Sequence, residues 1–341
     1  MKMWFRPVKG IAFCIVAAFF GSQAMAQVQV KRSFPSAKRI SAFDNTTFCT
    51  AFLSDGSLLT IRDIPIVDLR DVDKIAFNPT GSSLALMRGK KPVSIYSFRD
   101  RNKKLFELKE QRKSKELKGR KNLNFFVPGP VGAELMKDAS KGDIVPVAMC
   151  YGADARNFLV ANSLGEIIVY DTKAYLPQAY IQGKAVATTI TMSPNNYFIA
   201  AGTGKNIDIW NFQTKELRTS LPMPAEVTEL VFSADASQMA VVTADKRLTI
   251  FDTKTWDKVD IFDKIGGTLT SPSFHPDGKY ISVVKDGNAI VIMNLKNSVP
   301  EQTLDENPGG VTGSRFFVNK QTSDVFTVSY THLTLPTKLE V

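Results

Sequence analysis

Short apolar runs alternate with polar turns along most of the chain, and this arrangement recurs at a nearly fixed interval. Each copy is an apolar strand, a turn, a second apolar strand, a polar turn, and a third strand closed by Asp or Asn. Four copies read AMCYGADARNFLVANSLGEIIVYD, TITMSPNNYFIAAGTGKNIDIWN, ELVFSADASQMAVVTADKRLTIFD and SPSFHPDGKYISVVKDGNAIVIMN, at residues 148–171, 189–211, 229–252 and 271–294. Regular recurrence of this kind indicates a repeat architecture.

The period of the repeat is close to 40 residues. The residues that close the third strand before Asp or Asn, namely Tyr170, Trp210, Phe251 and Met293, are spaced by 40, 41 and 42 residues. A fifth copy covers 74–96, and its spacing of 74 to the next copy leaves room for an insertion of about 30 residues. Weaker copies begin at Thr47 and Gly309. Units of this length are typical of four-stranded propeller blades.

Local chemistry agrees with strands joined by tight turns. The apolar runs are rich in β-branched and aromatic residues, and connections such as Asp277-Gly278 supply the positive φ that hairpins need. Ile207 and Ile209 alternate with other residues, which predicts one inward face for that strand. The predicted fold class is all-β, a β-propeller of four-stranded antiparallel blades. Six copies and part of a seventh predict seven blades, the last one truncated.

The turns and strand ends resemble those of WD-repeat-like and YVTN-type propellers. The matching turns are Phe77-Asn78-Pro79-Thr80-Gly81 and Phe274-His275-Pro276-Asp277-Gly278, and the matching strand ends are Tyr170-Asp171, Trp210-Asn211 and Phe251-Asp252. No Gly-His pair opens the repeats. The resemblance implies a propeller from an exported bacterial protein, over about residues 37–328. The resemblance indicates the architecture more than any function, because propellers carry many functions.

The first 26 residues have the order of a secretory signal peptide. Lys2, Arg6 and Lys9 precede an apolar run over 11–20, and Ala24-Met25-Ala26 gives a cleavage pattern before Gln27. We expect a mature protein that begins at Gln27, exported to the periplasm or to the outer membrane or exterior of a bacterium. An uncleaved anchor is the alternative, although the apolar run is too short to span a bilayer as a helix.

The last residues read as foreign to the repeat. The stretch VSYTHLTLPT at 328–337 resembles a translated adapter from sequencing libraries, and the repeat pattern stops at the same point. The expected propeller therefore covers 27–327, and 328–341 is expected to be a non-native tail. The alternating segment QVQVKRSF at 27–34 is a candidate strand for completing the last blade.

The net charge of +10 is concentrated in two places. The leader contributes +3, and residues 99–121 hold eleven Lys or Arg against four Asp or Glu, which leaves zero for the rest. Because the folded remainder is balanced, nucleic acid is not an expected partner. The insertion, predicted over 99–143, is a candidate partner-binding loop whose charged candidates are Arg112, Lys113, Lys115, Lys118, Arg120 and Lys121.

Candidate catalytic groups are scarce. His275 lies in a predicted turn without partners at metal-ligand spacing, and Gly202-Thr203-Gly204-Lys205 joins two strands without a helix that could bind phosphate. Carboxylates recur at Asp154, Asp171, Asp235, Asp252, Asp263, Asp277 and Asp286. They are interpreted as turn residues, although a propeller enzyme could gather them at its channel. No catalytic residue, metal site or cofactor is predicted.

Of the three cysteines, Cys14 lies in the leader and Cys49 and Cys150 lie in strand-like runs. Two buried free thiols are expected, and a disulfide between distant repeats is the alternative.

The sequence favours an extracytoplasmic interaction or scaffolding module that binds a protein, with an anionic envelope component as a further possible partner. Two alternatives stay open at this point. One is a lactonase- or hydrolase-like propeller enzyme with a channel carboxylate site. The other is the propeller module of a larger envelope-anchored protein.

Overall fold

The computed structural model describes residues 12–19, 29–36, 49–52, 58–61, 73–80, 82–97, 104–108, 144–304, 313–318 and 325–330. All regular secondary structure in these ranges is β-strand, and they contain no helix that could cross a membrane. The chain divides into a central unit, residues 70–264, and a terminal unit, residues 1–69 with 265–341.

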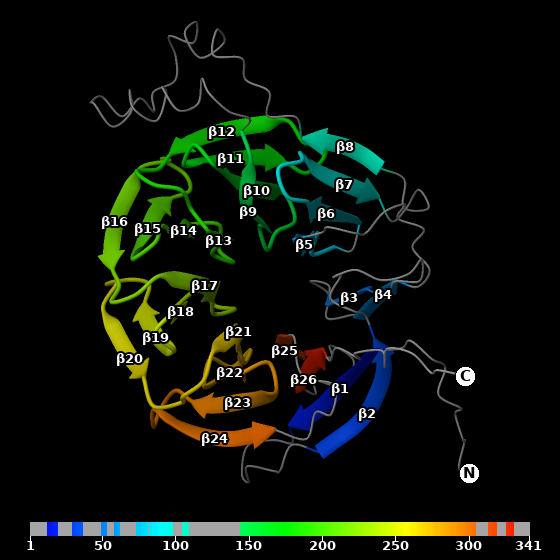
Figure 1. Ribbon diagram of the computed structural model, residues 1–341, viewed down its shortest axis with the longest axis vertical. Helices are drawn as coiled ribbons and strands as arrows, with labels where there is room; N and C mark the ends of the chain where they lie inside the picture. The colour runs from blue at the N-terminus through cyan, green and yellow to red at the C-terminus, as the bar shows by residue number, and fades with distance from the viewer. Residues whose placement is uncertain are drawn as a thin grey trace, which may run out of the picture. The chain divides into compact units, whose positions relative to one another are not determined.

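Four antiparallel four-stranded sheets make up the central unit (Figure 1). Their strands are β5 (Lys74–Phe77), β6 (Ser83–Met87), β7 (Val93–Ser97), β8 (Lys104–Leu108), β9 (Pro146–Tyr151), β10 (Asn157–Asn162), β11 (Glu166–Asp171), β12 (Pro177–Gln182), β13 (Thr189–Met192), β14 (Phe198–Gly202), β15 (Asn206–Asn211), β16 (Leu217–Pro222), β17 (Val227–Phe232), β18 (Gln238–Thr243), β19 (Arg247–Asp252) and β20 (Lys258–Phe262). Each sheet is a meander in which every strand pairs with the next along the chain. The sheets are propeller blades, which confirms the predicted fold class.

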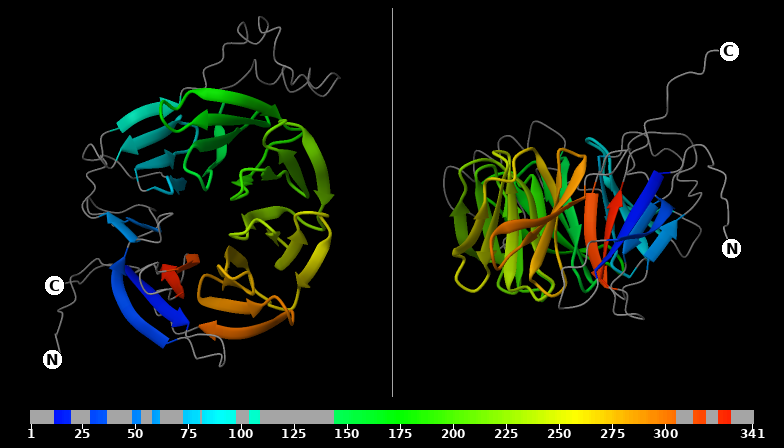
Figure 2. Two further views of the ribbon diagram at one scale, coloured as in Figure 1. Left: turned by 180° about the vertical axis from the view of Figure 1, so that it is seen from behind. Right: turned by 90° about the horizontal axis from the view of Figure 1, so that it is seen from below.

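The first strand of each blade lies innermost and the fourth lies outermost (Figure 1). The inner strands β5, β9, β13 and β17 contact one another in that order, so successive blades stack side by side. Seen from the side in the right-hand view of Figure 2, the strands run between two layers of connecting segments. The connections in one layer join the second strand of a blade to its third strand, and one blade to the next. The connections in the other layer join the first strand of a blade to the second, and the third to the fourth.

The predicted insertion begins later than the sequence indicated. Lys104–Leu108, inside the predicted range 99–143, is the fourth strand of its blade and pairs with β7. Leu108 is buried in the cluster that holds Ala85 and Ile95. The sequence pattern did not reveal this strand, because its segment is charged. An outer strand has one exposed side and therefore tolerates Lys and Glu.

The third strands are buried on both faces, which corrects the prediction of a single inward face. Strand β15 is buried from Ile207 through Trp210, and strand β19 is buried from Leu248 through Phe251. A blade between two neighbours has no solvent face at its middle strands, so polar side chains there need partners. Asp208 is 4% exposed and accepts hydrogen bonds from Ser220 Oγ at 2.6 Å and Thr203 Oγ1 at 3.3 Å.

The Asp or Asn that ends each third strand closes the turn to the fourth. Oδ1 of Asp171 accepts the N–H groups of Lys173 at 3.0 Å and Ala174 at 2.8 Å. Asp252 Oδ1 does the same for Lys254 and Thr255, at 2.7 and 3.1 Å. These side chains bond the backbone two and three residues on, which explains why the repeat keeps Asp or Asn at this position.

Four residues after this Asp, two aromatic side chains contact the preceding blade. Tyr175 and Trp256 both have left-handed backbones, with φ of 53° and 64°. Trp256 packs edge-on against Phe198, with ring centroids 5.1 Å apart. Tyr175 OH lies 2.9 Å from Ser83 Oγ and 2.8 Å from Tyr151 OH. Burial raises the pKa of both tyrosines, so these hydroxyls stay neutral.

In the terminal unit, one further blade contains β21 (Leu269–Phe274), β22 (Tyr280–Lys285), β23 (Ala289–Asn294) and β24 (Val299–Leu304). A second sheet has the order β2-β1-β26-β25, from strands β1 (Ala12–Phe19), β2 (Gln29–Ser36), β25 (Gly313–Val318) and β26 (Val325–Tyr330). Strands β3 (Cys49–Phe52) and β4 (Leu58–Ile61) form a two-stranded sheet.

The antiparallel sheet β2-β1-β26-β25 of the terminal unit includes residues of both predicted end segments. Strand β2 overlaps the predicted blade-completing segment 27–34, and β1 falls inside the predicted leader. Strand β26 includes Val328, Ser329 and Tyr330 of the predicted tail, and residues 331–341 lie outside the described ranges. Signal cleavage after Ala26 would remove β1 from this sheet. The leader and the foreign tail stay predictions.

Cys150 is a free thiol in strand β9, as expected. It packs against the cluster that contains Met192 and Leu159, and burial raises its pKa to about 12. Cys49 and Cys14 lie in strands β3 and β1, and their side chains lie outside the described residues.

Gly202 is a tight contact between two blades. A Cβ added there would lie 2.6 Å from Thr189 Cγ2 and 2.8 Å from Val227 Cγ1, and Val227 belongs to the next blade. We therefore expect Gly202→Ala to lower the free energy of unfolding by about 1–3 kcal/mol, through overpacking, in urea denaturation.

Gly204 provides the matched control two residues away. Its φ is +67°, and an added Cβ would meet nothing within 4 Å. Gly204→Asn should cost less than about 1 kcal/mol, because Asn tolerates this backbone conformation. Equal losses for the two variants would contradict the close approach of the blades at Gly202.

Candidate functional site

The inner strands of the central unit all begin at the same end of the blades. We call the connecting residues there the start face: Asp73 with the segments 88–92, 163–165, 183–188, 203–205, 223–226, 244–246 and 263–264. The opposite face consists of the segments 78–80, 152–156, 172–176, 193–197, 212–216, 233–237 and 253–257. The two faces use their polar side chains differently.

Lys74 joins three blades at the start face. It is the first residue of β5, and its Nζ donates hydrogen bonds to Val147 O and Thr188 O, both at 3.0 Å. Val147 lies in the next blade, and Thr188 lies immediately before the inner strand of the blade after that. Desolvation lowers the pKa of Lys74, and the negative charges of Asp73 and Glu229 oppose this shift.

Exposed lysines without intramolecular partners surround this point. They are Lys90, Lys91, Lys184, Lys205, Lys246 and Lys264. None of the six ammonium groups has a hydrogen bond or ion pair with a described residue. Start-face segments hold seven Lys or Arg against four Asp or Glu, whereas the opposite-face segments hold four of each. The start face is therefore the more basic of the two described faces.

On the opposite face, the polar side chains hold their own turns together. Ser193 Oγ donates to Asn195 Oδ1 at 2.7 Å, and Ser233 Oγ donates to Asp235 Oδ1 at 2.6 Å. Asp154 has no serine partner, because Gly152 occupies that position, and it accepts Asn196 Nδ2 of the next blade at 2.9 Å. These bonds stabilise the fold and leave those groups less available to a ligand.

The predicted loop residues Arg112, Lys113, Lys115, Lys118, Arg120 and Lys121 lie outside the described residues. The strands on either side of the segment are β8 and β9. Strand β8 ends, and β9 begins, at the end of the blades that carries the start face. The loop role of these residues stays a prediction.

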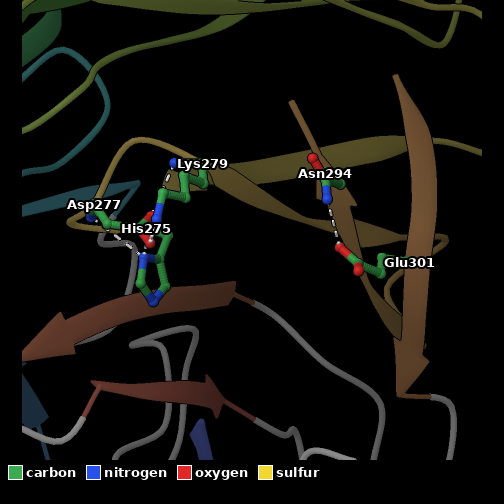
Figure 3. A network of polar contacts seen from close by, with 5 residues as sticks. All are labelled: His275, Asp277, Lys279, Asn294 and Glu301. Atoms are coloured by element: carbon green, nitrogen blue, oxygen red, sulfur yellow. Dashed lines mark hydrogen bonds and ion pairs between the residues drawn. The ribbon is translucent and has the colours of Figure 1, made fainter. Parts of the chain in front are cut away.

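His275 lies in a turn of the terminal unit, as expected from the sequence. Its Nδ1 lies 2.6 Å from Asp277 Oδ1, and the residue is 7% exposed (Figure 3). Its ring packs edge-on against Tyr280 and Phe316. The backbone N–H of Asp277 also approaches this nitrogen, at 3.2 Å. Burial lowers the pKa of His275, and the Asp277 carboxylate opposes that shift.

Figure 3 also shows the polar contacts around this turn. Lys279 Nζ lies 3.9 Å from Asp277 Oδ2, and Asn294 Nδ2 donates to Glu301 Oε2 at 3.0 Å. The His275–Asp277 pair occupies the same turn positions as Ser233 and Asp235 in the central unit. The geometry is that of a turn, consistent with the interpretation from the sequence.

The recurring carboxylates act mainly as turn acceptors. Six of the seven accept a backbone N–H: Asp154, Asp171, Asp235, Asp252, Asp277 and Asp286. Asp263 forms no hydrogen bond with a described residue. Within the described ranges, no group of three or more His, Cys, Asp or Glu could hold a metal ion.

Sequence reasoning missed the start face. Lys74 was included in a repeat copy only as the first residue of a strand, and the unpaired lysines stand singly or as one pair in turns of a balanced region. A lysine at the start of an inner strand was the available signal, because that position borders the axis shared by the blades.

Comparison with known proteins gives distant matches, one of which illustrates the likeness. The periodic tryptophan protein 2 homologue of Dictyostelium discoideum is 29% identical over 132 residues, which covers 32% of this chain and 14% of that protein. No family model matches the chain. The match and the repeated four-stranded sheets fit a WD-like propeller. Since the chain spans only 14% of that relative, the relative's activity and partners are not findings about this chain.

Removing the Lys74 ammonium should loosen the contact between blades. We expect Lys74→Met to lower the free energy of unfolding by about 1–2 kcal/mol, because two charge-assisted hydrogen bonds at a hydrated surface are lost. Lys205→Met, on the same face and without a bond to a described residue, should stay within about 0.5 kcal/mol of the original chain. Urea denaturation measures both, and indistinguishable midpoints would refute the bridging role.

Acidification should destabilise the protein through His275. The folded pKa is lowered, so below about pH 6.5 the unfolded chain binds the proton more readily and the free energy of unfolding falls. His275→Ser copies the Ser233–Asp235 turn and should flatten the dependence between about pH 7 and 5. Denaturation at several pH values tests this, and an unchanged slope in the variant would count against it.

Proposed function

We propose that this chain is an exported propeller that acts as a protein-binding scaffold and receives its partner on the start face. The observation that carries the proposal is the contrast between the two faces of the central unit. The start-face segments hold six lysines without a partner among the described residues, whereas the opposite-face segments hold two, Lys173 and Lys254, together with Arg156.

The stacked blades suit this role because they hold the start face on a rigid support. Loops positioned by a rigid scaffold commonly carry binding function. The bridging hydrogen bonds of Lys74 connect three blades at this face. A bound partner would therefore meet connecting segments whose supports are fixed relative to one another.

Catalysis is not part of the proposal. Six of the seven recurring carboxylates already accept backbone hydrogen bonds, so they are poorly placed to act as general acids or bases. The proposed location is outside the cytoplasm of a bacterium, which rests on the order of charged, apolar and small residues before Gln27.

Site-specific photo-crosslinking in the native host tests the proposal. A photoreactive residue replaces Lys205 on the start face, and in a second chain it replaces Lys254 on the opposite face; both lysines are exposed. We expect a discrete protein adduct from position 205 and none from position 254. Intact-mass measurement of the same preparations should give a chain that begins at Gln27.

An adduct from position 254 alone, or equal adducts from both positions, would overturn the assignment of the start face. A retained leader would overturn the proposed export while leaving the binding face intact. The two readouts therefore separate the two parts of the proposal.

A further inference from the structure

We propose that the start face recognises an acidic segment of its partner protein, a run of Asp and Glu side chains that crosses the four blades. This inference rests on the proposed function and specifies the chemistry of the partner.

The unpaired lysines are distributed so that every blade contributes to the surface. Lys90 and Lys91 follow β6, Lys184 follows β12, Lys205 precedes β15, and Lys246 and Lys264 flank the last two strands of their blade. An extended segment that crosses the start face would meet at least one ammonium group from each blade. Such an arrangement fits a string of carboxylates better than a single small anion.

Lys74 adds an unused donor close to the inner strands. An ammonium group has three N–H donors, and Lys74 uses two for Val147 O and Thr188 O. Its third donor has no partner among the described residues. A carboxylate of the partner could accept this hydrogen bond without breaking the bridge between blades.

The negative charges of Asp73 and Glu229 act on Lys74, and few other carboxylates compete for the start-face lysines. Asp73 accepts the N–H of Gly89, and Asp245 accepts Thr243 Oγ1 at 2.5 Å and pairs with Arg247 Nε at 3.4 Å. Glu226 and Asp263 are the other two acidic side chains in the start-face segments. The unpaired lysines therefore outnumber the two uncommitted carboxylates, and the face is complementary to a negative partner.

The apolar surface argues for a protein segment over a membrane or a nucleic acid. Among the described residues, the exposed large hydrophobic side chains are Leu176, Tyr197, Val259, Ile261 and Val299. None of them lies in the start-face segments. Interfacial membrane binding uses apolar side chains beside the basic ones, and single-stranded nucleic acids stack on aromatic rings. Lysines without such neighbours fit side-chain carboxylates.

The test measures binding of the full chain to a fluorescent peptide composed only of Asp and Glu, by anisotropy at low salt. A triple variant replaces Lys184, Lys205 and Lys246 with Glu. The matched control replaces Lys173, Lys254 and Lys258 with Glu, at the other end of two of these three blades, and carries the same change in net charge. A peptide of Asn and Gln and vesicles that contain phosphatidylglycerol are the other probes.

We expect the peptide to bind the unmodified chain and the control, with affinities within about threefold of each other, and the start-face triple to bind at least about tenfold more weakly. The difference should shrink at about 1 M salt, where the Debye length falls to about 3 Å. Equal weakening by the two triples would overturn the proposal, because net charge alone would then explain binding.

Two other outcomes would also overturn it. One is no binding of the acidic peptide; the other is a start-face preference for the vesicles or for the neutral peptide. If the peptide fails while crosslinks from position 205 persist, the scaffold function stands and only the acidic partner is rejected. If the peptide does not bind and position 205 gives no crosslink, the assignment of the binding surface to the start face is wrong.

Discussion

The whole architecture depends on covering the two apolar faces of every blade. Strand β15 illustrates the requirement, because its residues from Ile207 to Trp210 are buried on alternate sides of the sheet. A four-stranded sheet of this kind exposes its core unless a neighbour stands on each side. Contacts between blades therefore stabilise the fold. Examples are Gly202 against Val227, Trp256 against Phe198, and the hydrogen bonds of Lys74 that connect three blades.

The same repeat determines which end of the blades remains available for binding. The turn motif that identifies the family likeness uses Asp, Asn and Ser to satisfy its own backbone, as Asp171 and Ser233 do. Those side chains already form hydrogen bonds within the fold, so they are less available to a ligand. Connections at the start face close with glycine or lysine at left-handed positions, Gly204 and Lys246 for example, and leave ammonium groups in solvent. The start-face segments therefore carry an excess of positive charge, whereas the charges of the opposite-face segments balance.

The sequence predicted the first three strands of the regular blades well, because those strands are apolar and end at a recurring Asp or Asn. The fourth strands were not identified: β16 reads LRTSLP with alternating exposure, and β8 lies in a charged segment. An outer strand is fixed by pairing with its neighbour, which leaves little hydrophobic signal. The start face escaped prediction for a different reason, since Lys74 reaches Thr188 across 114 residues and periodicity says nothing about such contacts.

If neighbouring blades stabilise one another, no blade of the central unit opens alone. Amide hydrogen exchange, followed by mass spectrometry over residues 157–171, 198–211 and 238–252, tests it most directly, because these segments hold the middle strands of three blades. Equal free energies of opening are expected for the three segments, each matching the free energy of global unfolding in urea. A free energy of opening that is about 2 kcal/mol lower for one segment than for the others would contradict mutual stabilisation of the blades.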